Sequence, residues 1–187
     1  MYVNDADSLN DLLVIAPDMG AVERARYYAD LIKCDVGCFN KRRDYSILVD
    51  GKNPIVAHDY LGTSMKDKNI IIVDDMIASG GSVLDIAEKA KEKGAKKVFI
   101  CTTFALFTEG IKAFDEAYNK GLIDKVYSTN ITYVPDYIKE REWYVDVDCS
   151  LKVAQIIHRL NKGESLEPLH HDGSETYKKL LELKRIS

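Results

Sequence analysis

The chain is poor in the residues that mark several large classes of protein. Among its 187 residues are only four cysteines, four histidines, four prolines and one tryptophan. The scattered cysteines exclude a disulfide-rich secreted scaffold, and no cysteine or histidine array has the spacing of a zinc site. No apolar run approaches the roughly 20 residues that span a bilayer, and the polar, acidic first ten residues are unlike a secretory signal. We therefore expect a cytoplasmic protein without a membrane partner.

The chain also lacks an excess of positive charge. It has 26 Lys and Arg against 30 Asp and Glu, for a formal net charge of −4. A broad nucleic-acid surface needs a positive field to meet the phosphate backbone, so we expect no nucleic-acid partner. Apolar residues make up 46% of the chain, which is enough for one ordinary core at this length.

Short apolar runs alternate with amphipathic stretches along most of the chain. Strands are predicted at 12–16, 35–39, 70–73, 97–104, 126–129 and 144–148, and helices at 20–32, 83–94, 109–120, 135–141 and 151–160. The run at 70–73, Ile-Ile-Ile-Val, is typical of a central parallel strand that is covered on both faces. This alternation predicts an α/β fold with a mostly parallel sheet flanked by helices.

Two segments depart from the alternation. Residues 45–49 alternate in hydropathy, and 51–54 (Gly-Lys-Asn-Pro) is a turn signal, so a β-hairpin flap is predicted within 44–66. After Gly163 the chain has the character of an appendage, with a capped helix expected over 174–183. We expect one domain over 1–168 and a tail over 169–187.

The segment 69–82, NIIIVDDMIASGGS, is the most informative part of the chain. A buried strand delivers Asp74 and Asp75 at its carboxyl end, and a turn of small residues then leads into a helix: Ala78, Ser79, Gly80, Gly81 and Ser82. Such a turn points free N–H groups and the positive end of the helix dipole at an anion. The spacing is neither that of a Walker loop nor that of a dinucleotide fingerprint. We therefore expect this turn to bind a phosphate.

The two carboxylates must face another part of the ligand, because they would repel the same phosphate. Vicinal hydroxyls or a hydrated Mg²⁺ are natural partners for them. A phosphate with a diol about one sugar away describes ribose 5-phosphate. The alternative is that both acids only solubilise the strand end and that Ser82 and Asp85 form an ordinary capping box.

An apolar run, Asp-Asp and a small-residue turn together resemble the phosphoribosyl pyrophosphate loop of type I phosphoribosyltransferases. APDMGAVERAR at 16–26, NKRRD at 40–44 and the run from VDVDCS to GESLEPL at 145–169 sharpen the match. With these segments the chain is similar to the ribose-phosphate pyrophosphokinase family over about 12–169. The resemblance implies a type I phosphoribosyltransferase-like fold. It also implies transfer of diphosphate from MgATP to the 1-hydroxyl of ribose 5-phosphate, which gives phosphoribosyl diphosphate and AMP.

The resemblance also implies roles for individual residues. Asp74 and Asp75 would bind the ribose hydroxyls, and the turn at 78–82 would hold the 5-phosphate. Asp18 would help to bind Mg²⁺, although it could be only the cap of the following helix. Lys41 and Arg43 would be catalytic, lying over the transferring phosphoryl group on a loop that closes, unless this basic run is a solvated surface. Arg24 is expected to be a surface charge of its helix.

The sequence departs from the family in two residues and in length. Ala78 stands where the family's loop usually has Asp, and Phe104 where it commonly has His. The family's chain has two similar domains, and this sequence matches the second, so we expect the ribose 5-phosphate-binding, carboxyl-terminal half. Without the first half, which brings most of the ATP pocket, we expect it to be inactive, and we expect a homo-oligomer, by resemblance dimers within a hexamer. A self-contained phosphoribosyltransferase and a non-catalytic regulatory homologue are the alternatives.

Overall fold

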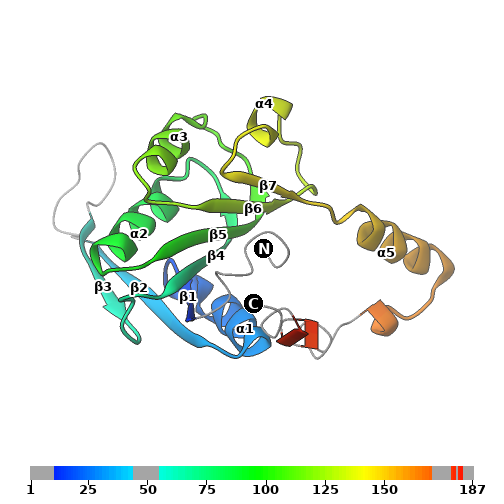
Figure 1. The fold of residues 1–187 in the computed structure, drawn as a ribbon. Coiled ribbons are helices and arrows are strands. Elements are labelled where there is room, and N and C mark those ends of the chain that lie inside the picture. The colour runs from blue at the N-terminus through cyan, green and yellow to red at the C-terminus, as the bar shows by residue number, and fades with distance from the viewer. Residues whose placement is uncertain (1–10, 44–54, 170–177, 180, 183–187) are drawn as a thin grey trace.

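A mostly parallel sheet forms the centre of the molecule. The computed structural model describes residues 11–43, 55–169, 178–179 and 181–182. Its strands lie in the order β3-β2-β1-β4-β5-β6-β7 (Figure 1), and every neighbouring pair is parallel except β2 with β3. Their bounds are β1 Leu12–Ala16, β2 Asp35–Arg43, β3 Ile55–Leu61, β4 Asn69–Ile77, β5 Lys97–Ala105, β6 Lys125–Thr129 and β7 Tyr144–Val147.

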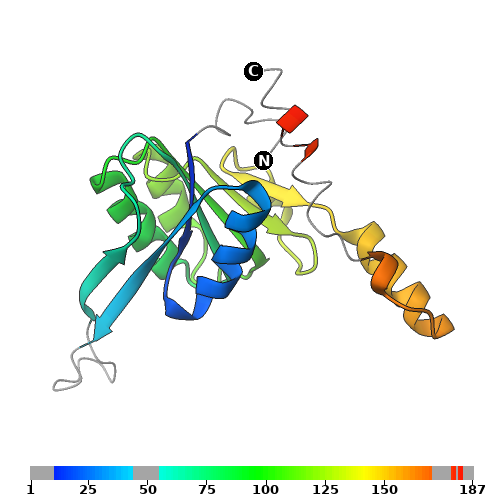
Figure 2. The ribbon, with the colours of Figure 1, turned by 90° about the horizontal axis from the view of Figure 1, so that it is seen from below.

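Helices cover both faces of this sheet. One face carries α1 and the other carries α2 and α3 (Figure 2), and Ile138 of α4 is buried in the same core as α2 and α3, so the predicted α/β fold class is confirmed. The helices are α1 Val22–Ile32, α2 Gly81–Glu92, α3 Lys112–Asn119, α4 Asp136–Lys139 and α5 Ser150–Lys162, with short 3₁₀ turns η2 Met19–Ala21 and η3 Glu167–Leu169.

The central strand β4 supplies side chains to two separate cores. Ile70 and Ile72 are buried in the larger cluster, under α2 and α3, while Ile71 and Val73 are buried in the smaller cluster, under α1. Strand side chains alternate between faces, so a continuous apolar run is what a strand covered on both sides requires. The predicted central strand is therefore confirmed.

Aromatic rings fasten α3 to the edge of the sheet. The Phe114 and Trp143 rings are stacked with centroids 5.4 Å apart, and Phe107 meets Phe114 edge-on at 5.1 Å. The Trp143 indole donates a hydrogen bond to Asp115 Oδ1 at 2.8 Å, which satisfies its one polar group in a buried position. This cluster fixes the helix that lies beneath the small-residue turn described below.

The antiparallel hairpin is present, but one of its arms differs from the prediction. β2 does not end at Phe39; it continues to Arg43 and pairs with β3 from Cys38 opposite Leu61 to Arg43 opposite Ile55. The first arm of the hairpin is therefore β2 itself. The predicted arm at 45–49 and the turn at 51–54 lie outside the described residues.

α5 leaves the carboxyl end of β7 and extends away from the sheet (Figures 1 and 2). None of its residues is buried, and Leu151, Ile157 and Leu160 are 73%, 54% and 61% exposed. Of the helix predicted over 174–183, residues 178–179 and 181–182 are described, and they are helical. In the part of the chain that the structure describes, no helix is both long and apolar enough to cross a membrane.

Candidate active site

The candidate site lies where the order of the sheet reverses. β1 and β4 are parallel neighbours, with Leu12 opposite Asn69 and Ile15 opposite Ile72. From β1 the chain turns to β2 on one side, and from β4 it turns to β5 on the other. The connections after β1 and β4 therefore diverge and leave a crevice outside the carboxyl ends of these strands, where open α/β sheets bind ligands.

Asp74 and Asp75 lie inside β4 rather than just after it, because the strand continues to Ile77. Between Asp74 and Ile77 the side chains of β4 no longer alternate regularly between the two faces of the sheet. Ile77 joins the cluster of Ile70 and Ile72, although strict alternation would place it with Ile71 and Val73. Asp74 and Asp75 lie where the regular alternation is interrupted. Their side chains therefore both reach the face of the sheet that carries α1.

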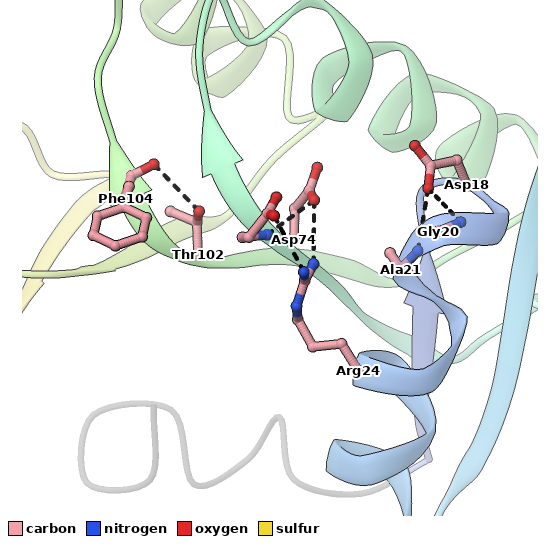
Figure 3. Close-up of polar contacts among 8 residues, drawn as sticks. Asp18, Gly20, Ala21, Arg24, Asp74, Thr102 and Phe104 are labelled. Atoms are coloured by element: carbon pink, nitrogen blue, oxygen red, sulfur yellow. Dashed lines mark hydrogen bonds and ion pairs between the residues drawn. The ribbon is translucent and has the colours of Figure 1, made fainter.

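Arg24 bridges the two carboxylates. Its Nη1 lies 3.5 Å from Asp74 Oδ1 and its Nη2 lies 3.2 Å from Asp75 Oδ2 (Figure 3). The expectation that Arg24 is a surface charge of its helix is therefore wrong. α1 begins near the carboxyl end of β1, beside β4, and this brings the first turn of α1 to the same edge as the two acids.

The two carboxylates have different electrostatic environments. Burial raises the pKa of Asp74 to about 6, and the negative charges of Asp75 and Asp18 add to the rise. The Asp75 backbone N–H donates to Asp74 Oδ1 at 2.9 Å and acts in the opposite direction. For Asp75, slight burial is outweighed by its interaction with Asp74 and by the Arg24 guanidinium, which together lower its pKa. Near pH 7 both acids are therefore mainly ionised, and Asp74 is the one that takes up a proton first as the pH falls.

Asp18 caps the short turn that leads into α1. Its Oδ1 accepts hydrogen bonds from the backbone N–H groups of Gly20, at 2.9 Å, and Ala21, at 3.2 Å (Figure 3). The capping role of Asp18 is thus confirmed, and its Oδ2 takes no part in these two hydrogen bonds. Because the charge of Asp18 raises the pKa of Asp74, the two carboxylates belong to one electrostatic neighbourhood.

No group of three or more His, Cys, Asp or Glu side chains that could hold a metal ion occurs among the described residues. Mg²⁺ is commonly bound by one or two carboxylates together with substrate phosphates and water, and not by a closed protein cage. Asp18 fits that partial kind of site, in which the substrate supplies most of the ligands.

The small-residue turn depends on Gly80. Residues 78–80 form a bend, and α2 begins at Gly81 with Gly80 as its N-cap at a φ of +89°. A Cβ atom at Gly80 would lie 2.3 Å from Cε2 of Phe114, so both the backbone conformation and the close approach of the ring require glycine here. The ring beneath and the positive φ fix the path by which the chain enters α2.

The start of α2 is open toward solvent. Gly81 and Ser82 are exposed and lie in the first turn of α2, at the positive end of the helix dipole. The N-cap of α2 is Gly80, so Ser82 does not occupy the cap position that the alternative of a capping box from Ser82 to Asp85 requires. Ala78 is also exposed, and its carbonyl accepts from the Thr108 N–H at 2.9 Å, which ties the bend to the segment after β5.

Lys41 and Arg43 have backbones in β2, not in a loop as expected. They face His58 and Ile55 of β3 across the antiparallel pair. β2 is parallel to β1, whose last paired residue, Ala16, lies opposite Cys38. The Lys41–Arg43 backbone therefore extends past the end of β1, on the same edge of the sheet as Asp18.

A largely apolar hollow of about 320 Å³ adjoins Asp74 on the α1 face of the sheet. Tyr28 of α1, Thr102 of β5 and Tyr127 of β6 are among its lining residues. Phe104, one of the two departures, lies opposite Met76 in the β4–β5 pair, and its carbonyl accepts from Thr102 Oγ1 at 3.4 Å (Figure 3). Phe104, which departs from the family at this position, therefore lies in β5, the strand next to the two acids.

The phosphoribosyl transferase domain family matches residues 2–131 of this chain. The match covers more than half of the 187 residues, so the chain belongs to this family of phosphoribosyl transferase domains. Its fold is also that of a phosphoribosylpyrophosphate synthetase from Mycobacterium smegmatis, with a TM-score of 0.68 and 23% identity over 86% of this chain and 47% of the other.

Within the family, the chain resembles ribose-phosphate pyrophosphokinases. The protein of that name from Thermococcus kodakarensis is 36% identical over 138 residues, which are 71% of this chain and 46% of the relative. The one from Mycoplasma pneumoniae is 37% identical over 64% of this chain and 35% of the relative, and the one from Nostoc sp. is 30% identical over 89% and 44%. The predicted resemblance is confirmed, and the chain spans less than half the length of these relatives.

Proposed function

We propose that this chain is the ribose 5-phosphate-binding half of a ribose-phosphate pyrophosphokinase. The reaction would transfer diphosphate from MgATP to the 1-hydroxyl of ribose 5-phosphate and give phosphoribosyl diphosphate and AMP. The observation that carries the proposal is the crevice beside β1 and β4, where an open helix start and two adjacent carboxylates lie at one edge of the sheet. The turn at 78–82 would hold the 5-phosphate, and Asp74 and Asp75 would accept hydrogen bonds from the ribose hydroxyls.

The charges in the crevice favour one orientation of the sugar. Ionised carboxylates accept hydrogen bonds only, so they suit hydroxyl donors and repel a phosphate. The start of α2 has the opposite preference, because its N–H groups and dipole favour an anion. A sugar phosphate that satisfies both ends is therefore held in a single direction, as positioning for phosphoryl transfer requires.

Cations at the carboxyl edge of the sheet would lie against the transferring phosphoryl group. Mg²⁺, held by Asp18 together with substrate phosphates, would neutralise part of the phosphoryl charge. Lys41 and Arg43 would supply further positive charge from the end of the β2–β3 hairpin. Phosphoryl transfer depends chiefly on such positioning and charge neutralisation, and no covalent nucleophile is needed from the protein.

A second domain would be needed for the complete reaction. The relatives are more than twice as long as the matched region, and α5 presents Val153, Ile157 and Leu160 to solvent on one face of the helix. Contiguous apolar side chains of this kind mark surfaces that are covered in an assembly. We propose that the domain over 1–168 binds the sugar phosphate alone but synthesises product only when an ATP-binding half covers it, in a cytoplasmic homo-oligomer.

A calorimetric titration tests the proposal. The purified chain is titrated with ribose 5-phosphate in the presence of Mg²⁺, and the double variant Asp74→Asn/Asp75→Asn is measured beside it. We expect the double substitution to weaken binding by more than about tenfold, or roughly 1.4 kcal/mol. Asp67→Asn is the matched control, because Asp67 is exposed at the amino end of β4, opposite the site, and Asn tolerates its φ of +61°.

The other outcomes point to other functions. Binding of phosphoribosyl diphosphate without binding of ribose 5-phosphate would favour a self-contained phosphoribosyltransferase. Binding of neither ligand would contradict the proposal and favour a non-catalytic homologue.

A further inference from the structure

We propose that Arg24 is a positioning residue of the sugar site, whose guanidinium holds the Asp74 and Asp75 carboxylates side by side so that one oxygen of each remains for a vicinal diol. The identity of the diol rests on the proposed function. The placement of the carboxylates by Arg24 rests on the contacts alone.

Two adjacent acids in a strand do not ordinarily act together. Successive side chains point to opposite faces, and two carboxylates brought to one side repel each other. The interruption of the alternation between Val73 and Ile77 brings both to the α1 side, and a shared cation offsets the repulsion there. Arg24 supplies that cation from a helix that is 50 residues distant in sequence from Asp74.

The two terminal nitrogens of the Arg24 guanidinium contact different acids. Nη1 contacts Oδ1 of Asp74 and Nη2 contacts Oδ2 of Asp75. A lysine ammonium is a single point and cannot match this planar arrangement. The contacts with Arg24 use Oδ1 of Asp74 and Oδ2 of Asp75. Each carboxylate has a second oxygen whose lone pairs can accept a hydrogen bond from one hydroxyl of the diol.

The burial of the three side chains distinguishes this arrangement from an ordinary surface ion pair. The Asp74 and Arg24 side chains are 20% and 33% exposed, while Asp75 is 61% exposed. The inner acid is thus fixed between the sheet and the arginine, and the outer acid faces the crevice. Asp18 and Tyr28 also border this cluster, and the charge of Asp18 opposes ionisation of Asp74. Arg24 is the cation that the described contacts place against both acids.

The test compares Arg24→Met with Arg24→Lys and with Arg26→Met as the matched control. Arg26 lies on the same helix, is exposed and points about 200° round the helix from Arg24. Ribose 5-phosphate binding with Mg²⁺ is measured by calorimetry between pH 5.5 and 8.5, and helix content by circular dichroism. At pH 7.5 we expect Arg24→Met to weaken binding on the order of tenfold or more, Arg24→Lys to restore it only in part, and Arg26→Met to change it by less than about twofold.

A positioning role also predicts a change in the pH profile. Without the guanidinium, the loss of binding on acidification, the acid limb of the profile, should begin at a higher pH, because both carboxylates lose the cation that contacts them. Equal affinities and equal pH profiles for Arg24→Met and Arg26→Met would overturn the proposal. Weaker binding of Arg24→Met with an unmoved acid limb would also overturn it, because Arg24 would then act on the ligand or on the fold and not through the acids.

A measurement on the free protein separates this inference from the proposed function. Carboxyl-carbon NMR titrations of the aspartates, with and without Arg24→Met, need no ligand. We expect the pKa of Asp75 to rise when Arg24 is removed. If the wild-type chain fails to bind ribose 5-phosphate, the proposed function fails, and a raised Asp75 pKa still supports the placement by Arg24. An unchanged Asp75 titration overturns the placement whatever the ligand is.

Discussion

Replacing Asp74 by Asn should stabilise the free protein at pH 8 while it weakens binding of the sugar. Burial raises the pKa of Asp74 from 3.8 to about 6, so the fold is more compatible with the neutral acid than with the carboxylate. Asn is neutral at every pH and retains an oxygen that can accept the hydrogen bond from the Asp75 N–H. The substitution therefore removes an unfavourable buried charge without removing its backbone contact.

The sign and size of the effect follow from linkage. An acid whose pKa is raised in the folded state binds its proton more tightly when folded, so its favourable contribution is present at low pH and is lost as the pH rises from about 4 through about 6. Raising the pKa of Asp74 from 3.8 to about 6 corresponds to about 3 kcal/mol at most. Because Asp75 shifts in the opposite direction and titrates together with Asp74, we expect a net gain of about 1–2 kcal/mol for the Asn variant at pH 8.

Urea unfolding at pH 4.5, 6 and 8 measures this difference. The free energy of unfolding of the Asp74→Asn variant should exceed that of the wild type at pH 8 and approach it at pH 4.5, and Asp67→Asn should show no such trend. If Asp74→Asn were equally or less stable than the wild type at pH 8, with the same difference at pH 4.5, the argument that burial opposes ionisation of this acid would be refuted.

Two further variants test other parts of the site. Gly80→Ala should lower the free energy of unfolding by about 1–3 kcal/mol, because it combines a positive φ with a clash against a buried ring. Gly121→Ala has a similar φ of +68° and open space around its Cβ, so the difference between the two melting curves measures the clash, and equal losses would contradict it. Asp18→Asn should leave thermal stability nearly unchanged, since Asn is also a good cap, but should reduce the Mg²⁺ dependence of ribose 5-phosphate binding. An Mg²⁺ dependence like that of the wild type would argue against a metal role for Asp18.

Much of this architecture could be predicted from local sequence patterns. The continuous apolar run at 70–73 identified a strand buried on both faces, and Gly80 and Gly81 identified a tight turn between this strand and α2. Both signals are local: side-chain periodicity and backbone freedom act over a few residues. For the same reason the fold class could be inferred before any long-range contact was known.

The parts that could not be predicted depend on tertiary contacts. Hydropathy gave no reason to extend β2 through the polar residues 40–43, which become a strand because β3 pairs with them. Nor could periodicity show the interruption of the alternation before Ile77. Arg24 had the pattern of a solvated helix charge, and only the adjacency of β1 and β4 brings it to acids that are 50 residues distant. A charged residue in the first turn of a helix that follows a central strand is the signal that could have pointed to it.

Trp143, which stacks on Phe114, can serve as an intrinsic fluorescence probe. Trp143 is the single tryptophan in the sequence, and its ring lies 5.4 Å from that of Phe114, which in turn lies directly beneath Gly80. Indole emission is sensitive to the charges and rings around it, and here one aromatic ring, that of Phe114, lies between the fluorophore and the turn at 78–82. Binding at the turn that we propose holds the 5-phosphate can therefore be followed by intrinsic fluorescence, without a label and without altering any residue assigned to the site.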